Sequence, residues 1–105
     1  MSGPLRVEIS DLAMAQVRAA EEWWRQNRPK APNAVREELE RAAVLISLQP
    51  ESGAIARNVS LPGVRRIHLT RIRYYLFYRV VPAPEAIEIL ALWHSSRQGA
   101  PALRT

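Results

Sequence analysis

The stretch Gly63–Arg97, GVRRIHLTRIRYYLFYRVVPAPEAIEILALWHSSR, decides the fold of this chain. Its apolar residues are mostly β-branched or aromatic and recur at alternating positions, which is typical of half-buried β-strands. Two breaks in the alternation, at Thr70–Arg71 and at Pro82–Glu85, have the composition of turns. The pattern therefore predicts three short antiparallel strands, near residues 64–69, 72–81 and 86–94.

The polar side chains of this stretch are almost all cationic or can become so. They are Arg65, Arg66, His68, Arg71, Arg73, Arg79, His94 and Arg97. Residues 1–51 hold seven basic and eight acidic residues, whereas residues 52–105 hold eight arginines and two glutamates. Fourteen of the fifteen basic residues are arginine, which binds carboxylate and phosphate in bidentate geometry, although a GC-rich genome would also enrich it. The second half is therefore expected to form an anion-binding surface.

The length of 105 residues and an apolar share of 48% predict one domain with a single modest core. The sequence has no cysteine and two histidines, so neither a disulfide nor a metal site with several protein ligands is expected, and no cofactor is indicated. No apolar run reaches the roughly 18 residues of a membrane span, and none resembles a signal sequence. These features predict a cytoplasmic protein that does not bind a membrane.

The first half of the chain predicts a strand followed by two helices. Leu5–Ile9 alternates as a strand does, and Ser10 is a good N-cap for a helix over residues 11–28. A second helix is expected from about Asn33 to just before Pro50. Each helix carries one apolar stripe at helical spacing. The stripes are Ala13, Val17, Ala20 and Trp24 on the first helix, and Val35, Leu39, Ala42 and Ile46 on the second.

A short connection makes the two helices antiparallel, and their single stripes make them cover one face of the sheet. The predicted fold class is α+β, with an N-terminal strand and an antiparallel helical hairpin packed on one face of a four-stranded, mainly antiparallel sheet (β-αα-βββ). Residues 49–63 are expected to form a loop. Glu37 and Arg41 are expected to pair along the second helix, and Ala102–Thr105 to fray.

Three motifs at the predicted strands carry a resemblance to a known family. They are GVRR at residues 63–66, YLFYRV at 75–80 and ILALWHSSR at 89–97. With the order of elements, they resemble the ParE branch of the RelE/ParE superfamily of toxins from type II toxin-antitoxin systems, over nearly the whole chain. The resemblance implies a toxin of a plasmid stabilisation module, held inactive in a hetero-oligomer with a cognate antitoxin protein. It also implies growth arrest through inhibition of DNA gyrase by binding, without catalysis.

The same superfamily implies an alternative, a RelE-type toxin that cleaves mRNA on the ribosome. Its catalytic candidates are Arg65, Arg66, Arg73 and His94, since a histidine can protonate a leaving oxygen and arginines can neutralise a phosphate. The second half departs from the RelE pattern, because it has no lysine and no tyrosine after residue 78. A third hypothesis is a domain that only binds its antitoxin.

The residues predicted to contact the antitoxin or the target are cations on the sheet face that the helices leave uncovered, together with one surface tryptophan. Trp23 and Trp24 diverge by about 100° around the helix, so one of them must lie near the surface. Arg79 lies within an apolar run and is expected to pair with Glu88 or Glu8. The predicted binding residues are Arg65, Arg66, His68, Arg71, Arg73, His94, Arg97 and Trp23. The alternative is a solvated face whose arginine stems cover apolar surface.

Overall fold

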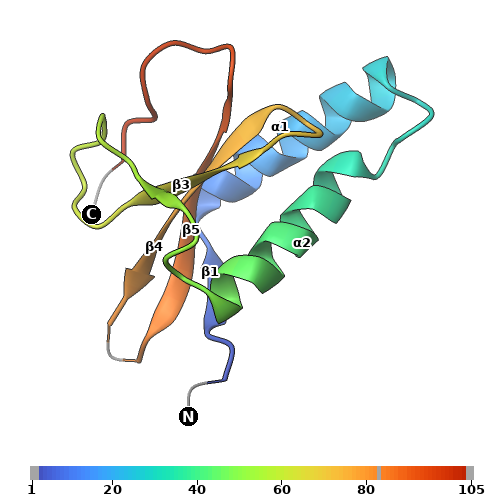
Figure 1. Cartoon of the computed structure of the whole chain (residues 1–105). Helices are drawn as coiled ribbons and strands as arrows, with labels where there is room; N and C mark the ends of the chain where they lie inside the picture. Colours follow the sequence, from blue (N-terminus) through green and yellow to red (C-terminus); the bar gives the residue numbers. More distant parts are fainter. Residues whose placement is uncertain (1–2, 83, 104–105) are drawn as a thin grey trace.

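A computed structural model describes residues 3–82 and 84–103 (Figure 1). Its elements in chain order are β1 (Arg6–Ile9), α1 (Asp11–Asn27), α2 (Ala34–Leu48), β2 (Ala54–Ile55), β3 (Arg65–Leu69), β4 (Tyr74–Val81) and β5 (Ala86–His94). Apart from β2, the bounds agree with the predicted elements to within two residues. The turn predicted at Pro82–Glu85 joins β4 to β5, and its residue 83 lies outside the described part of the chain.

Ser10 ends β1 and begins α1, as its position in the sequence predicts. Its side-chain oxygen accepts a hydrogen bond from the backbone N–H of Ala13 at 3.1 Å, and its hydroxyl donates to the carbonyl of Leu90 at 3.2 Å. The first bond satisfies a donor that the helix leaves unpaired, and the second ties the start of α1 to β5. Asn33 precedes α2 and makes no such side-chain bond.

The helical hairpin packs on one face of the sheet, with both predicted stripes turned inward (Figure 1). The stripe residues are buried except Trp24 and Leu39, which are partly buried against the same core. They meet Leu76, Tyr78 and Ile87 of the sheet, each 0% exposed. Burying such side chains stabilises the fold by roughly 1.5–3 kcal/mol each. Neither helix of the described chain is long and apolar enough to span a membrane.

The sheet has five strands, in the order β1-β5-β4-β3-β2, so the expectation of four strands is wrong. β1 runs parallel to β5, and the other neighbours are antiparallel. The additional strand, β2, lies within the predicted loop 49–63 and pairs Ala54 with Arg66 and Ile55 with Arg65. Two residues are too few to show a period, and Ile55 is exposed, so alternation of buried residues gives no signal for this strand.

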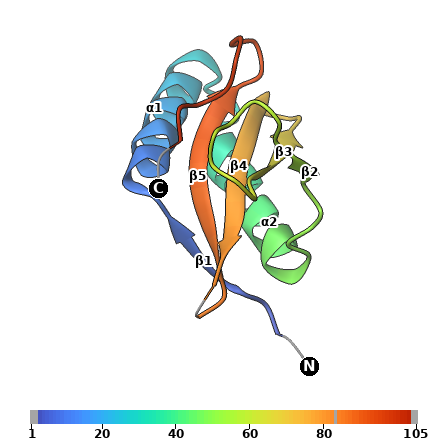
Figure 2. The same cartoon turned by 90° about the vertical axis from the view of Figure 1, so that its left-hand side faces the viewer.

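The sheet face turned away from the helices, called the distal face here, is partly covered by other segments of the chain (Figure 2). Leu61 and Val64, from the segment before β3, pack there against Phe77 and Leu90. Leu103 packs against the same residues and is 6% exposed. The expectation that residues 102 and 103 fray is therefore wrong, because an apolar side chain returns to the sheet, and residues 104 and 105 lie outside the described chain.

The ion pairs of Arg41 and Arg79 can be compared with the partners predicted for them. Arg41 pairs with Glu38 at 2.7 Å and not with Glu37, because Glu37 lies 2.9 Å from Arg71 on the β3–β4 turn. The expected bond along the helix has therefore been replaced by a tertiary contact. Arg79 pairs with Glu88 at 3.0 Å, as one of its two predicted partners, and both side chains are partly buried.

Candidate functional site

The eight predicted binding residues lie in three separate places. Arg65 lines a pocket beside the end of α2. Arg66, His68 and Arg97 lie on the distal face. The remaining four, Arg71, Arg73, His94 and Trp23, surround a cavity at the C-terminal end of α1. Of the cations expected to converge on the uncovered sheet face, Arg66, His68 and Arg97 do lie there, whereas Arg65 and His94 point to the helix side because side chains alternate along each strand.

The alternation separates the candidate catalytic residues. Arg65 lies opposite Tyr78 on the helix side, whereas Arg66 lies opposite Phe77 on the distal face. His94 also lies on the helix side, in the row of Tyr74, which is four residues from Tyr78 along β4. Four residues along a strand correspond to about 13 Å. Arg65, Arg66 and His94 therefore cannot act on one bond.

The cavity at the end of α1, called the tryptophan cavity here, has a volume of about 510 Å³. Its walls come from the last turns of α1, from the β3–β4 turn and from the ends of β4 and β5. The lining residues include Trp23, Trp24, Arg28, Arg73, Tyr74 and His94. Trp23 is the exposed member of the tryptophan pair, at 48%, and Trp24 packs against the core, as their divergence around the helix predicts.

Arg73 adopts a left-handed backbone conformation, with φ of 63°. Its N–H donates to the carbonyl of Leu69 at 2.8 Å, and its carbonyl accepts from the N–H of Ser95 at 2.9 Å. The β3–β4 turn and the end of β5 thus impose a conformation that glycine adopts at no steric cost but that costs other residues about 1–2 kcal/mol. Among the described residues the guanidinium of Arg73 has neither a hydrogen bond nor an ion pair.

His94 lines the tryptophan cavity, and Ser96 holds its ring through Nδ1. The backbone N–H of Ser96 donates to Nδ1 of His94 at 3.1 Å, and the hydroxyl of Ser96 lies 2.7 Å from the same nitrogen. An N–H can only donate, so Nδ1 is an acceptor and Nε2 carries the proton of the neutral ring. The ring also meets Tyr74 edge to face at 5.0 Å. Burial raises the pKa of Tyr74, so its phenol stays protonated.

The charge of Arg71 is compensated from outside the cavity. Its guanidinium lies 2.9 Å from Glu37 and 3.5 Å from Glu38 on α2. The hydrogen bond to Glu37 raises the pKa of Arg71 above its ordinary value. Arg71 therefore joins the β3–β4 turn to α2, and Arg28 and Arg73 are the cations of the cavity that keep their charge uncompensated within the described residues.

The distal face carries a row of aromatic rings with arginines on them. His68, Tyr75 and Trp93 are direct neighbours across β3, β4 and β5. The guanidinium of Arg66 lies 4.2 Å from the ring centre of Tyr75, and that of Arg97 lies 3.7 Å from that of Trp93. Such cation–π contacts hold the two charges flat against the rings while their N–H edges remain free.

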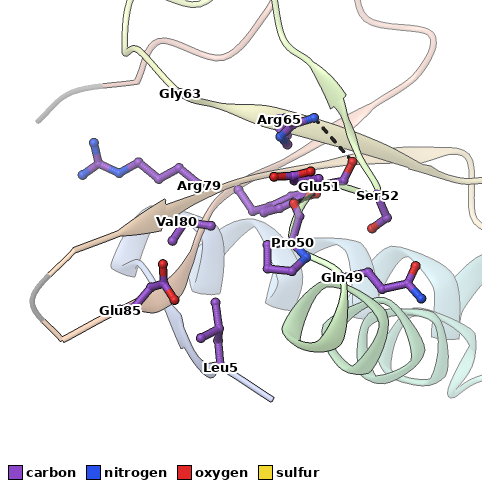
Figure 3. A pocket seen from close by; sticks show the side chains of 11 residues that line it. Leu5, Gln49, Pro50, Glu51, Ser52, Gly63, Arg65, Arg79, Val80 and Glu85 are labelled. Atoms are coloured by element: carbon purple, nitrogen blue, oxygen red, sulfur yellow. Dashed lines mark hydrogen bonds between the residues drawn. The ribbon is translucent and has the colours of Figure 1, made fainter. Parts of the chain in front are cut away.

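The pocket beside the end of α2, called the Arg65 pocket here, has a volume of about 690 Å³ (Figure 3). Arg65 donates to the backbone carbonyls of Gly53 at 2.8 Å and Glu51 at 3.4 Å. In Figure 3 the guanidinium of Arg79 points away from Arg65. Glu51 and Glu85 also line the pocket, so its charges are mixed. Arg65 is therefore engaged in holding the loop after α2.

Three residues at these places are absent from the predicted binding residues. Arg28 is the last residue of the predicted first helix, and its guanidinium lies 5.6 Å from the ring centre of Trp23. Side chains three or four residues apart share a helix face, so the spacing of five residues gives no signal for that contact. The side chains of Tyr75 and Trp93 point to the same sheet face as that of Arg66, so knowledge of the strand register would have placed them together.

Comparisons with known proteins agree with this architecture. The helical hairpin on a mixed sheet is consistent with the ParE/RelE fold of toxins. The family described as ParE toxin of type II toxin-antitoxin system, parDE, matches residues 7–99. The chain therefore belongs to the ParE toxin family, as its motifs predict.

One solved structure supports the same fold assignment. It is described as the chromosomal ParDE TA system from P. aeruginosa, and it has a TM-score of 0.67 and 23% sequence identity to this chain. The similarity covers 89% of this chain and 98% of the other. No curated protein matches the sequence.

Proposed function

We propose that this chain is the toxin of a type II toxin-antitoxin module, that a cognate antitoxin neutralises it in a hetero-oligomer, and that it inhibits DNA gyrase by binding. Membership of the ParE family supports the first two parts. The cytoplasm, where gyrase acts, is then its place of action.

The observation that carries the choice of binding over catalysis is the separation of the four catalytic candidates. A ribonuclease needs a general acid or base and a phosphate-binding cation at the same phosphodiester. Arg66 lies on the opposite face from His94, and Arg65 holds the carbonyl of Gly53 at the other end of the sheet. Of the four candidates, only His94 and Arg73 share a cavity, and its other cations are Arg28 and Arg71, of which Arg71 is paired with Glu37.

The proposed binding surfaces are two places where arginines have no carboxylate partner within the described part of the chain. One is the distal face with Arg66 and Arg97, and the other is the tryptophan cavity with Arg28 and Arg73. A gyrase subunit and an antitoxin both offer carboxylates, for which arginine provides bidentate partners. Two surfaces on opposite sides of the sheet allow a partner to wrap around the chain.

Purified protein in two assays tests the proposal. We expect it to inhibit DNA supercoiling by gyrase, to leave mRNA intact in a ribosomal translation assay, and to lose its effect when the cognate antitoxin is added. Cleavage of mRNA with normal supercoiling would refute the proposal in favour of the RelE-type alternative. Inhibition of neither process would favour a domain that only binds its antitoxin.

A further test compares variants of the two arginines that point to opposite faces. Because a missing bidentate partner leaves a carboxylate unpaired, Arg66→Ala should weaken inhibition of gyrase more than Arg65→Ala, provided that both variants melt like the parent chain. A stronger loss for Arg65→Ala at equal stability would move the proposed surface to the Arg65 pocket.

A further inference from the structure

The tryptophan cavity offers hydrogen-bond donors and no carboxylate. Its lining includes the cationic residues Arg28 and Arg73, together with His94. No aspartate or glutamate lines the cavity among those residues. A group that fills it must therefore supply acceptors, and its volume of about 510 Å³ falls within the usual range of ligand pockets.

The conformation of Arg73 is an independent observation that points to the same place. A left-handed residue in a tight turn is least strained as glycine, yet this position carries a long cation without a partner among the described residues. Strain of this kind is concentrated at ligand sites, where the surrounding structure imposes it. The guanidinium is thus held at the rim of a cavity that already contains a second uncompensated arginine.

The remaining walls are apolar, which limits the kind of anion that fits. The ring of Trp23 is half exposed, and Ile72 and Tyr74 complete this side. Glu37 and Glu38 flank the cavity at Arg71 and would repel a chain of phosphates that extends beyond it. A single carboxylate beside an apolar side chain matches this surface better than a nucleic acid does.

We propose that the tryptophan cavity binds an acidic peptide segment of a protein partner, in which one carboxylate contacts Arg73 and Arg28 and an adjacent apolar side chain packs on Trp23. This inference rests on the proposed function only in assuming that the chain acts by binding a protein.

The three tryptophans of the chain provide the test, since Trp23 and Trp24 line the cavity and Trp93 lies on the distal face. Their indole N–H signals are followed by ¹⁵N NMR after assignment with Trp→Phe variants. The uniformly labelled chain is titrated into the millimolar range with the blocked peptide acetyl-Leu-Glu-Asp-Leu-amide, and separately with its neutral counterpart acetyl-Leu-Gln-Asn-Leu-amide. A short oligouridine is the third probe.

We expect the acidic peptide to shift the signals of Trp23 and Trp24, and any shift of Trp93 would report separate binding at the distal face. Arg73→Gly and Arg28→Ala should each weaken this binding by at least about tenfold, because each removes a charged hydrogen-bond donor. Arg18→Ala is the control, since it removes an exposed arginine of α1 that does not line the cavity and should leave the shifts of Trp23 and Trp24 unchanged. The spectrum of each variant reports whether it is folded.

Three results would overturn the proposal: no shift at Trp23 and Trp24, equal shifts with the neutral peptide, or unchanged affinity in both cavity variants. Stronger shifts of the same signals by oligouridine would also overturn it and assign the cavity to nucleic acid. The experiment contains neither gyrase nor ribosome, so a failure to inhibit supercoiling leaves its outcome unaffected and the two proposals fail separately.

Discussion

Replacing Tyr78 by phenylalanine removes the hydroxyl that joins the sheet to the loop after α2. Tyr78 is 0% exposed, its hydroxyl donates to the carbonyl of Pro50 at 2.7 Å, and it accepts from the N–H of Gly53 at 2.9 Å. A Cβ built on Gly53 would lie 2.7 Å from this hydroxyl, so the loop is packed directly against the ring. Tyr78→Phe therefore leaves two backbone groups without the partner that the hydroxyl provides.

A buried polar group without a partner costs about 1–3 kcal/mol, so the variant should lose about 2–5 kcal/mol of the free energy of unfolding. At roughly 4 °C per kcal/mol for a chain of this size, the melting temperature should fall by about 8–20 °C. Calorimetry or circular dichroism measures this, with Tyr75→Phe as the control, since its hydroxyl has no hydrogen bond within the described chain. Equal melting temperatures for the two variants would refute the reasoning.

Four further predictions concern other parts of the molecule. Ile46→Ala should destabilise the fold by about 2–5 kcal/mol, because Ile46 is fully buried, and a thermal shift no larger than that of exposed Arg41→Ala would contradict this. Arg73→Gly should be more stable than Arg73→Ala by up to about 1 kcal/mol in urea unfolding, since only glycine relieves the strain of the left-handed backbone. The opposite order of stability would show that the backbone at this position is not strained. His94→Gln should still arrest growth when expressed at matched levels. Complete loss of toxicity would contradict this and would identify His94 as a general acid, whose removal lowers a cleavage rate by about 10²–10⁴. The raised pKa of Tyr74 means that the unfolded chain releases this proton at a lower pH than the folded chain does. The contribution of neutral Tyr74 to the free energy of unfolding is therefore complete below pH 10.0 and is lost as pH rises through the raised pKa. In alkaline urea melts Tyr74→Phe should lose less stability than the parent chain, and an equal loss would contradict this.

The sequence by itself determined the elements and their inward faces. Ser10 capped a helix whose stripe from Ala13 to Trp24 faced the core, and the alternation in Gly63–Arg97 gave three strands to within two residues. These features depend on interactions between residues a few positions apart, which the pattern of one segment contains. The motifs on these strands also pointed to the ParE family.

The sequence also contains the information that Arg65 and Arg66 point to opposite faces of the sheet. Neighbouring residues of one strand point to opposite faces, so the strand pattern alone is enough to separate the two arginines. The expectation of a single arginine-rich face did not use this rule. The strand count also failed, because β2 has two residues and depends on its pairing with β3.

Only the tertiary structure decided which side chains meet. The tryptophan cavity joins the end of α1, the turn before Tyr74 and the end of β5, segments that are far apart in the chain. Its geometry depends on the left-handed conformation of Arg73 and on the capture of Arg71 by Glu37, both of which result from the way that the turn, β5 and α2 pack together. The return of Leu103 to the distal face has the same origin. Contacts of this kind depend on the relative placement of whole elements, which the period of any one segment does not encode.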